Sequence, residues 1–237
     1  MKDESHQGAK ARETNLLTGR PTEVLRRQTS VVSLFENVLD PVEADNLLLE
    51  LSRDLPFATE TDIVGLQSRP TCYFGDSSDC IFAYVGLTLR PRPWTATLQR
   101  LRDHVALVCG LKDQIALTAC LINYYPENEG YIPWHYDEVR AHGETKTVAS
   151  LSLGGPRRFR LRARGGDRSI ISDLMLPSGS VLLMQGSTQD EFEHCLPLLE
   201  HNSPHRISLT FRSIEPGWES SRQPPVDACC LQSPNIP

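Results

Sequence analysis

The sequence lacks any long apolar run, and no run approaches the ~18–20 apolar residues that a membrane-spanning helix needs. Its first residues, MKDESHQGAKARE, also lack the apolar stretch of a signal peptide. We therefore expect no association with a membrane and a location in the nucleus, the cytoplasm or both. Of the 237 residues, 39% are hydrophobic and 23% are charged, proportions that favour a globular chain over a disordered or fibrous one.

The cysteines have neither the spacing of a zinc finger nor that of a disulfide framework. There are seven, an odd number, and no C-x-x-C pair is present, so they indicate the free thiols of an intracellular protein. The chain also lacks an excess of basic residues. Its net charge of −6 argues against binding nucleic acid by bulk attraction alone, although a local basic patch stays compatible with it.

Composition divides the chain into three segments. Residues 1–33 mix charges with glycine, serine and threonine without any period, which predicts a flexible leader. Residues 217–237 contain four prolines and are predicted to form a disordered tail. The intervening segment, 34–216, has the length of one ordinary domain. We expect this domain to act as a monomer.

Local patterns predict two helices followed by many strands. One helix begins after Asp40, an N-cap acid followed by proline, and the other begins after Thr95 and ends at Gly110. Beyond residue 115, short apolar-alternating segments separated by turn residues predict strands. These are Ala116–Tyr125, Thr147–Gly154, Arg158–Arg164, Ile170–Leu176, Ser180–Gln185, Phe192–Leu198 and Arg206–Ser213. The order predicts an α+β fold, a double-stranded β-helix (jelly roll) of antiparallel strands braced by N-terminal helices.

A candidate metal site begins at His135-Tyr136-Asp137. Residues i and i+2 of an extended segment point the same way, so His135 and Asp137 can bind one ion from one side. His194 lies in a later predicted strand that could pair beneath them. Two histidines and one carboxylate form the facial triad of non-haem iron(II) oxygenases, and the same set could hold zinc.

The last predicted strand carries an unusual pair of arginines. Between Arg206 and Arg212 the residues alternate strictly, with Arg, Ser, Thr and Arg on one face and Ile, Leu and Phe on the other. Guanidinium groups bind carboxylates bidentately, so this face suits a dicarboxylate; the alternative is a solvated edge strand. Asn123 and Tyr125 share one face of the strand that leads to the H-x-D segment and could complete the same pocket.

Together these segments resemble a known enzyme family. The pattern NYY, HYD, SLSLGGPRRFRL, LPSGSVLLMQG, FEHCLP and HRISLTFR resembles the AlkB family of iron(II)/2-oxoglutarate dioxygenases, over roughly Ser68 to Pro216. The upstream RPTCYFGD and PRPW resemble the eukaryotic AlkB homologues that repair alkylated bases. The resemblance implies iron ligands at His135, Asp137 and His194. It implies 2-oxoglutarate contacts through Asn123, Tyr125, Arg206 and Arg212.

The resemblance also implies a reaction. Fe(II), O₂ and 2-oxoglutarate, with ascorbate as the reductant in vitro, would oxidise an N-methyl group of a base. The products would be succinate, CO₂, formaldehyde and the repaired base, of the 1-methyladenine or 3-methylcytosine type, in single-stranded or flipped-base DNA or RNA.

On the substrate side, the resemblance implies a lid over the base. Its residues would be Arg69, Tyr73, Phe74, Gly75 and Asp76. Arg158 begins an arginine row that alternates with core residues, either a phosphate track or a solvated sheet face. The family's repair enzymes carry a second acid two residues after the metal aspartate, where this chain has Val139. Glu138 takes that role only if the loop shifts.

Two alternatives to base demethylation follow from these observations. Val139 and the acidic net charge are compatible with an AlkB-like dioxygenase that acts on a protein or another substrate outside nucleic acids. A nucleic-acid-binding module with a silent triad is the third reading. The intact triad and both arginines count against it, because a binder needs no 2-oxoglutarate site.

Overall fold

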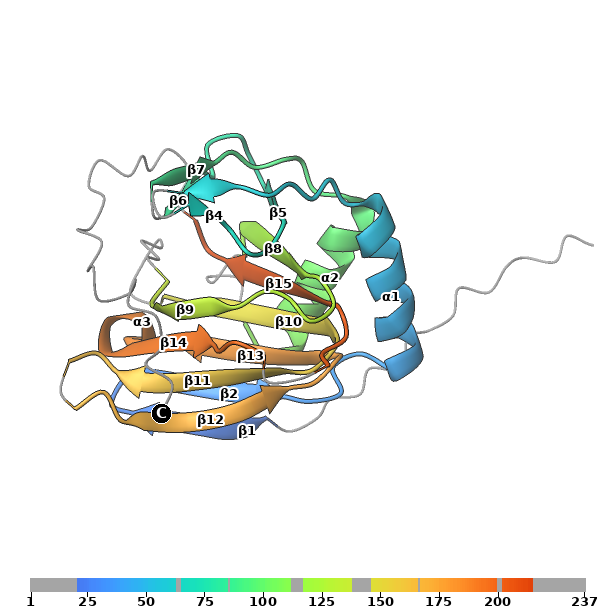
Figure 1. The fold of residues 1–237 in the computed structure, drawn as a ribbon. Helices are drawn as coiled ribbons and strands as arrows, with labels where there is room; N and C mark the ends of the chain where they lie inside the picture. Colours follow the sequence, from blue (N-terminus) through green and yellow to red (C-terminus); the bar gives the residue numbers. More distant parts are fainter. Residues whose placement is uncertain are drawn as a thin grey trace, which may run out of the picture.

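The structure is a computed structural model that describes most of the chain between residues 21 and 214. The described ranges are 21–62, 65–84, 86–111, 117–137, 146–165, 167–199 and 202–214. Two longer helices, α1 (Pro41–Asp54) and α2 (Ala96–Val108), lie beside two antiparallel sheets (Figure 1).

The larger sheet has seven strands. In spatial order they are β1 (Thr22–Arg27), β2 (Ser30–Phe35), β13 (Ser180–Gln185), β10 (Val148–Gly154), β15 (Arg206–Arg212), β8 (Ala119–Tyr125) and β5 (Thr71–Gly75). Every neighbouring pair is antiparallel. The strand with the two arginines, β15, therefore lies inside the sheet and not at its edge.

The smaller sheet has four strands and faces the larger one. Its order is β12 (Ile170–Leu176), β11 (Arg157–Ala163), β14 (Phe192–Leu196) and β9 (Ile132–His135). From β8 to β15 the chain crosses repeatedly between the two sheets, four strands in each, which is the winding of a double-stranded β-helix. The predicted jelly roll is confirmed.

Shorter elements complete the described fold. They are β3 (Thr61–Asp62), β4 (Gly65–Leu66), β6 (Phe82–Tyr84), β7 (Leu87–Leu89) and α3 (Thr188–Glu191). None of the described helices is long and apolar enough to cross a membrane.

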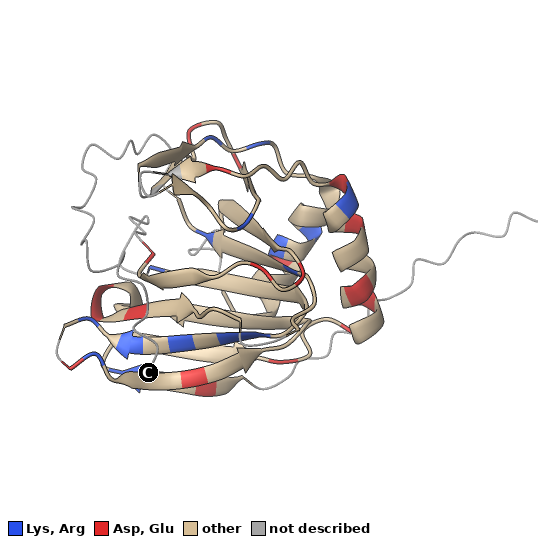
Figure 2. Cartoon of the chain, viewed as in Figure 1, with Lys and Arg blue, Asp and Glu red and all other residues tan. Residues whose placement is uncertain are grey.

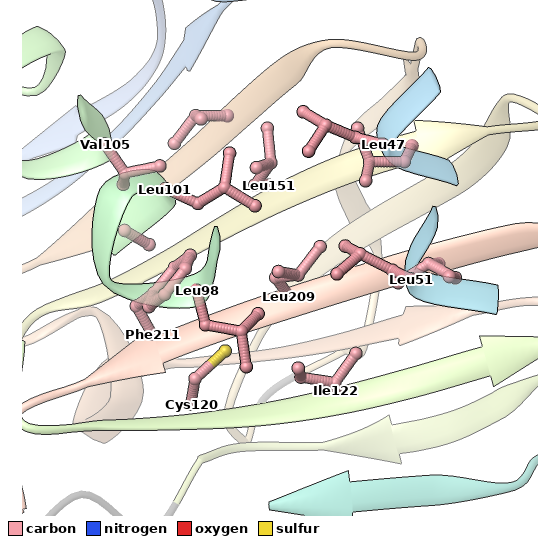
Figure 3. Close-up of a cluster of buried hydrophobic side chains, with 14 of the residues drawn as sticks. Leu47, Leu51, Leu98, Leu101, Val105, Cys120, Ile122, Leu151, Leu209 and Phe211 are labelled. Carbon is pink, nitrogen blue, oxygen red and sulfur yellow. The ribbon is translucent and has the colours of Figure 1, made fainter. Parts of the chain in front are cut away.

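Both predicted helices cover the outer face of the larger sheet. Their caps form as the sequence indicates: the Asp40 carboxylate accepts from Val42 N at 2.9 Å, and the Thr95 hydroxyl accepts from Leu98 N at 3.2 Å. Figure 3 shows the resulting core, in which side chains of α1 and α2 meet those of β8, β10 and β15. Its members include Leu47, Leu51, Leu98, Leu101, Val105, Ile122, Leu151, Leu209 and Phe211. This packing fixes the outward face of β15.

A second core fills the space between the two sheets. Tyr125 of β8, Phe159 and Leu161 of β11, and Leu182 of β13 are among its members. Because side chains alternate along a strand, the inward face of β15 points into this space. All seven residues of β15 are buried, so the solvated-edge interpretation of this strand is excluded.

The prediction of a flexible leader over residues 1–33 is wrong for its last part, which forms strands. Residues 22–27 and 30–33 lie in β1 and β2, and β2 pairs with β13 in the register Val32↔Met184. Charges in the preceding residues hide this strand in the sequence, whereas Val32 is fully buried in the fold. Residues 1–20 and the predicted tail, 217–237, lie outside the described residues.

Candidate metal centre and cosubstrate pocket

Strand pairing brings the two candidate histidines together. In the register between β14 and β9, His194 lies opposite His135, with ring centroids 4.2 Å apart. Asp137 follows β9 by two residues. The possible ligand atoms of all three residues lie within 4.8 Å of one another, as one metal ion requires. The three predicted ligands therefore meet at one point, on the inner side of the smaller sheet.

Hydrogen bonding and burial prepare the two imidazoles to bind a metal. The Nδ1 atom of His135 lies 2.9 Å from Pro133 O; an N–H at this position donates to the carbonyl and leaves Nε2 free to ligate. Burial, and then the proximity of His135, lowers the pKa of His194 to about 3. Desolvation also lowers the pKa of His135. Both rings are therefore neutral at neutral pH, the form that binds metals.

Asp137 is held by one charged and one neutral partner. Burial by itself would raise its pKa, but Arg212 and then the two histidines outweigh burial and lower it to about 2. Arg212 Nη2 donates to Asp137 Oδ1 at 2.9 Å. The backbone N–H of Asp137 donates to the side chain of Gln189, Oε1, at 2.9 Å. The carboxylate is thus ionised and fixed beside both histidines.

This donor set fits Fe(II). Two neutral imidazole nitrogens and one carboxylate oxygen, gathered on one side, leave coordination positions open for a cosubstrate and O₂. His194 and Asp137 are 5% and 8% exposed, and the ring of Phe159 stacks on His194 at 5.3 Å between centroids. The site combines a constrained ligand set with an apolar wall, which limits access of water.

Arg206 provides the second part of the site. It is 1% exposed, and its Nη2 donates to Ser152 Oγ at 2.9 Å and to Ser208 Oγ at 3.3 Å. Its guanidinium carbon lies 5.1 Å from the ring centroid of Tyr125. Its Nε and Nη1 atoms are buried without a hydrogen-bond partner among the described residues. A buried guanidinium with free donors is a site for a carboxylate.

The other predicted cosubstrate residues lie on the same inner faces. Arg212 donates to Asp137 through Nη2, and its buried Nε has no hydrogen-bond partner among the described residues. Asn123, 5% exposed, lies opposite Ser208 in the register between β8 and β15. The structure therefore places Asn123, Tyr125, Arg206 and Arg212 on the inner faces of two neighbouring strands, β8 and β15, from which Arg212 reaches the metal-ligand candidate Asp137.

Comparison with known proteins agrees with this geometry. A family model described as the 2OG-Fe(II) oxygenase superfamily matches residues 31–212. The human protein "Alpha-ketoglutarate-dependent dioxygenase alkB homolog 3" is 30% identical over 199 residues, which cover 79% of this chain and 67% of that protein. The chain belongs to the AlkB family of 2OG-Fe(II) oxygenases. It is therefore a 2-oxoglutarate-dependent dioxygenase whose family uses Fe(II), 2-oxoglutarate and O₂.

Other matches extend the likeness. The human protein "DNA oxidative demethylase ALKBH2" is 32% identical over 185 residues, which cover 73% of this chain and 69% of that protein. Among solved structures, one titled "The structure of OsALKBH1" superposes with a TM-score of 0.57 at 17% identity, and covers 80% of this chain and 100% of that one. At this identity the superposition supports the fold alone, the same jelly roll.

The predicted lid residues of this AlkB-family enzyme divide between the pocket and the core. Arg69 points toward the site: its Nε donates to Asn123 Oδ1 at 3.1 Å, and its charge acts on His135. Tyr73 is 4% exposed and donates its hydroxyl to Cys80 O at 2.7 Å. Phe74, 2% exposed, packs in the core beneath the helices. The prediction of Phe74 as a lid residue is therefore wrong, because its side chain faces the helix side of the sheet.

The last two lid candidates have structural partners. Gly75 lies where a Cβ atom would approach Pro91 Cβ to 3.0 Å. Asp76 accepts from Trp94 Nε1 at 2.6 Å and from Arg102 Nη1 at 3.0 Å. These contacts attach the end of β5 to the start of α2, and contact with substrate remains a prediction. Glu138 and Val139, the candidates for base selectivity, lie outside the described residues.

The arginine row lies on the outer face of the smaller sheet, and acidic side chains neutralise part of it. Figure 2 shows basic positions along β11 beside acidic ones on neighbouring strands. Arg158 and Arg160 both donate to Asp173 Oδ2, at 3.0 and 3.1 Å. Arg162 donates twice to Glu193 Oε2, at 2.7 and 2.9 Å. The row is thus a paired surface network, and a phosphate track along Arg158 remains a prediction.

Sequence reasoning missed the residues that hold the H-x-D segment in place. Gln189, 2% exposed, accepts from Asp137 N through its side chain and from Arg164 Nη1 through its backbone carbonyl, the latter at 3.1 Å. The guanidinium carbon of Arg164 also lies 3.8 Å from the ring centroid of Tyr136. These contacts join β9, β11 and α3. No local motif marks Gln189, since its role depends on where α3 meets the end of β9.

Proposed function

We propose that this enzyme is an oxidative demethylase of N-alkylated bases in DNA or RNA. One observation carries the proposal: a triad of His135, Asp137 and His194 next to two buried arginines with unused donors. Two relatives support it by their names, since one is called a DNA oxidative demethylase and the other an alpha-ketoglutarate-dependent dioxygenase.

In this reaction iron held by His135, Asp137 and His194 would supply the oxidising chemistry, and one oxygen atom of O₂ would be inserted into the N-methyl group. The other oxygen atom enters 2-oxoglutarate, which loses CO₂ and becomes succinate. The hydroxymethyl group then leaves the ring nitrogen as formaldehyde: its hydroxyl proton is released, and the electron pair of the broken C–N bond stays on the nitrogen. The oxidant, O₂, and the co-reactant, 2-oxoglutarate, are thus both substrates of the family's reaction.

The protein's own residues bind and orient the metal and the cosubstrate. His135, Asp137 and His194 would hold the metal. Arg206 and Arg212 would bind the carboxylates of 2-oxoglutarate, with Asn123 and the Tyr125 hydroxyl adding hydrogen bonds. Arg69, next to Asn123 and His135, is the predicted lid residue best placed to approach the base.

The test is mass spectrometry of single-stranded oligonucleotides. DNA and RNA versions carrying 1-methyladenine or 3-methylcytosine would be incubated with the protein, Fe(II), ascorbate and 2-oxoglutarate, and succinate would be measured in parallel. We expect loss of the methyl group with an equal amount of succinate. Asp137→Asn should abolish both, because it removes the anionic ligand. Asp103→Asn, the same change at an exposed helix position, should abolish neither.

A second candidate function has its own support. The net charge of −6 and the pairing of the arginine row with Asp173 and Glu193 favour a substrate other than a polyanion. Succinate production without demethylation of any oligonucleotide would establish this alternative, an AlkB-family dioxygenase acting outside nucleic acids. Binding to single-stranded DNA that does not weaken with salt would support the same conclusion.

A further inference from the structure

A third buried arginine, Arg157, interacts with Arg206 and is not explained by the triad or by the two arginines of β15. It is the first residue of β11, and its side chain lies on the inward face of that strand with Phe159 and Leu161, while Arg158 faces outward. At 2% exposure it is buried almost as completely as Arg206. A charged side chain rarely occupies such a position without a partner of opposite charge.

Close backbone contact places Arg157 next to Arg206. Gly154 lies opposite Arg206 in the register between β10 and β15, and Gly155 N donates to His205 O at 2.9 Å. With a φ of +87°, Gly154 turns the chain where a Cβ atom would lie only 2.5 Å from His205 O. The turn therefore brings the start of β11 against the segment that leads into Arg206.

Arg157 has only neutral partners in the described chain. Its Nη2 donates to Pro204 O at 3.1 Å and its Nη1 to Pro156 O at 3.3 Å; Nη1 also contacts the Ser203 hydroxyl. Its Nε is buried without a partner. Among the described residues no carboxylate forms an ion pair with Arg157 or with Arg206. Two positive charges thus lie in the core without an ion-pair partner in the part of the chain that the structure describes.

The two guanidinium groups and the side chain of Tyr125 interact electrostatically. Burial and then Arg206 lower the pKa of Arg157 to about 10, whereas Tyr125 acts to raise it. Burial also lowers the pKa of Arg206, and Tyr125 opposes this effect. The ligand-free protein therefore carries like charges that repel each other at one end of the pocket. An anion bound there relieves the repulsion.

We propose that Arg157 is a positioning residue that makes this end of the pocket doubly positive, and so selects a cosubstrate with a second carboxylate over a 2-oxo acid that has only one. Its positive charge acts through the electrostatic field at Arg206 and Tyr125, and Arg157 takes no part in the oxidation itself. The inference rests on the 2-oxoglutarate cosubstrate of the family and is independent of the base that is demethylated.

The experiment compares binding of two ligands of equal chain length, 2-oxoglutarate and 2-oxopentanoate, to the full-length protein loaded with Mn(II), by isothermal titration calorimetry. The variants are Arg157→Gln, Arg157→Met and Arg157→Lys. The matched control is Arg160→Gln, because Arg160 lies on the same strand but on its outer face. No oligonucleotide is present, so a failure of base demethylation does not affect the result.

We expect both neutral variants to bind 2-oxoglutarate at least about tenfold more weakly. Their affinity for 2-oxopentanoate should change much less, and Arg157→Lys should retain most of the preference for the dianion. In assays of turnover, the neutral variants should show a raised KM for 2-oxoglutarate with little change in kcat. The control should resemble the unmodified protein.

Four outcomes would overturn the proposal. Equal weakening of both ligands would show that Arg157 only supports the shape of the loop, as would failure of Arg157→Lys to preserve the preference. An unchanged dissociation constant for 2-oxoglutarate would show that the second charge is irrelevant. Failure of both neutral variants to fold, measured by urea unfolding, would also contradict it, since removing one of two repelling charges should not cost the ligand-free protein its fold.

Discussion

Replacing Gln189 by methionine tests how the fold fixes the metal carboxylate. The substitution keeps a side chain of similar length in a position that is 2% exposed, but it removes the oxygen that accepts from Asp137 N at 2.9 Å. The N–H of Asp137 would then be a buried donor without an acceptor. Leaving such a group unsatisfied costs about 1–3 kcal/mol of unfolding free energy.

The same substitution should weaken metal binding. Residues that orient a ligand without touching the metal typically contribute about 10–100-fold to metal affinity, which corresponds to about 1.4–2.7 kcal/mol. We expect Gln189→Met to raise the dissociation constant for Mn(II) by that factor, while the rate at saturating metal changes less. Calorimetry with Mn(II) and urea unfolding of the metal-free protein measure the two effects separately.

The control is Gln99→Met, the same change at an exposed position of α2. It should alter neither the unfolding free energy nor the metal affinity. If Gln189→Met bound Mn(II) within twofold of the unmodified protein, the hydrogen bond from Asp137 N would have no role in placing the carboxylate. In that case α3 would have no role in positioning the metal site.

Three further predictions follow from the site and the core. Asp137→Ala should lower the unfolding free energy by about 3–5 kcal/mol, because it leaves Arg212 buried without its partner; Asp137→Asn, which keeps an acceptor, should cost clearly less in the same urea titration. Arg206→Ala should raise the KM for 2-oxoglutarate about 30-fold or more, since it removes a buried charge with free donors; an unchanged KM in steady-state assays of succinate would contradict its role. Stability should fall above about pH 9, because burial raises the pKa of Cys72 to about 12 and that of Cys195 to about 11. The unfolded chain then releases protons that the folded chain keeps, at up to about 1.4 kcal/mol per pH unit for each thiol; urea titrations at pH 8 and pH 10.5 would show no such loss if these thiols were solvated.

The cosubstrate pocket and the metal centre share residues, so they should respond to each other. Arg212 bonds to the metal ligand Asp137 and still has a buried Nε without a described partner. Arg206, six residues earlier on the same face of β15, is joined to Ser152 and Ser208 instead. One strand therefore carries both a group that holds the ionised carboxylate and a group free for a cosubstrate.

Local sequence determined the features that depend on neighbouring residues along the chain. The alternation from Arg206 to Arg212 separated an apolar face from a polar one before any partner strand was known. The spacing of His135 and Asp137 placed both on one side of an extended segment, and the caps at Asp40 and Thr95 set the starts of two helices. Each of these rests on backbone geometry within a few residues.

Tertiary structure alone decided what depends on register and on distant segments. The pairing of His194 with His135, the contact of Arg212 with Asp137 and the support from Gln189 all join parts of the chain more than fifty residues apart. The burial of β2 against β13, and of Phe74 on the helix side, likewise depends on which strand becomes a neighbour. A shift of one residue in register would turn every side chain to the other face. Sequence periodicity therefore sets the faces of a strand, and only the folded sheet sets what each face meets.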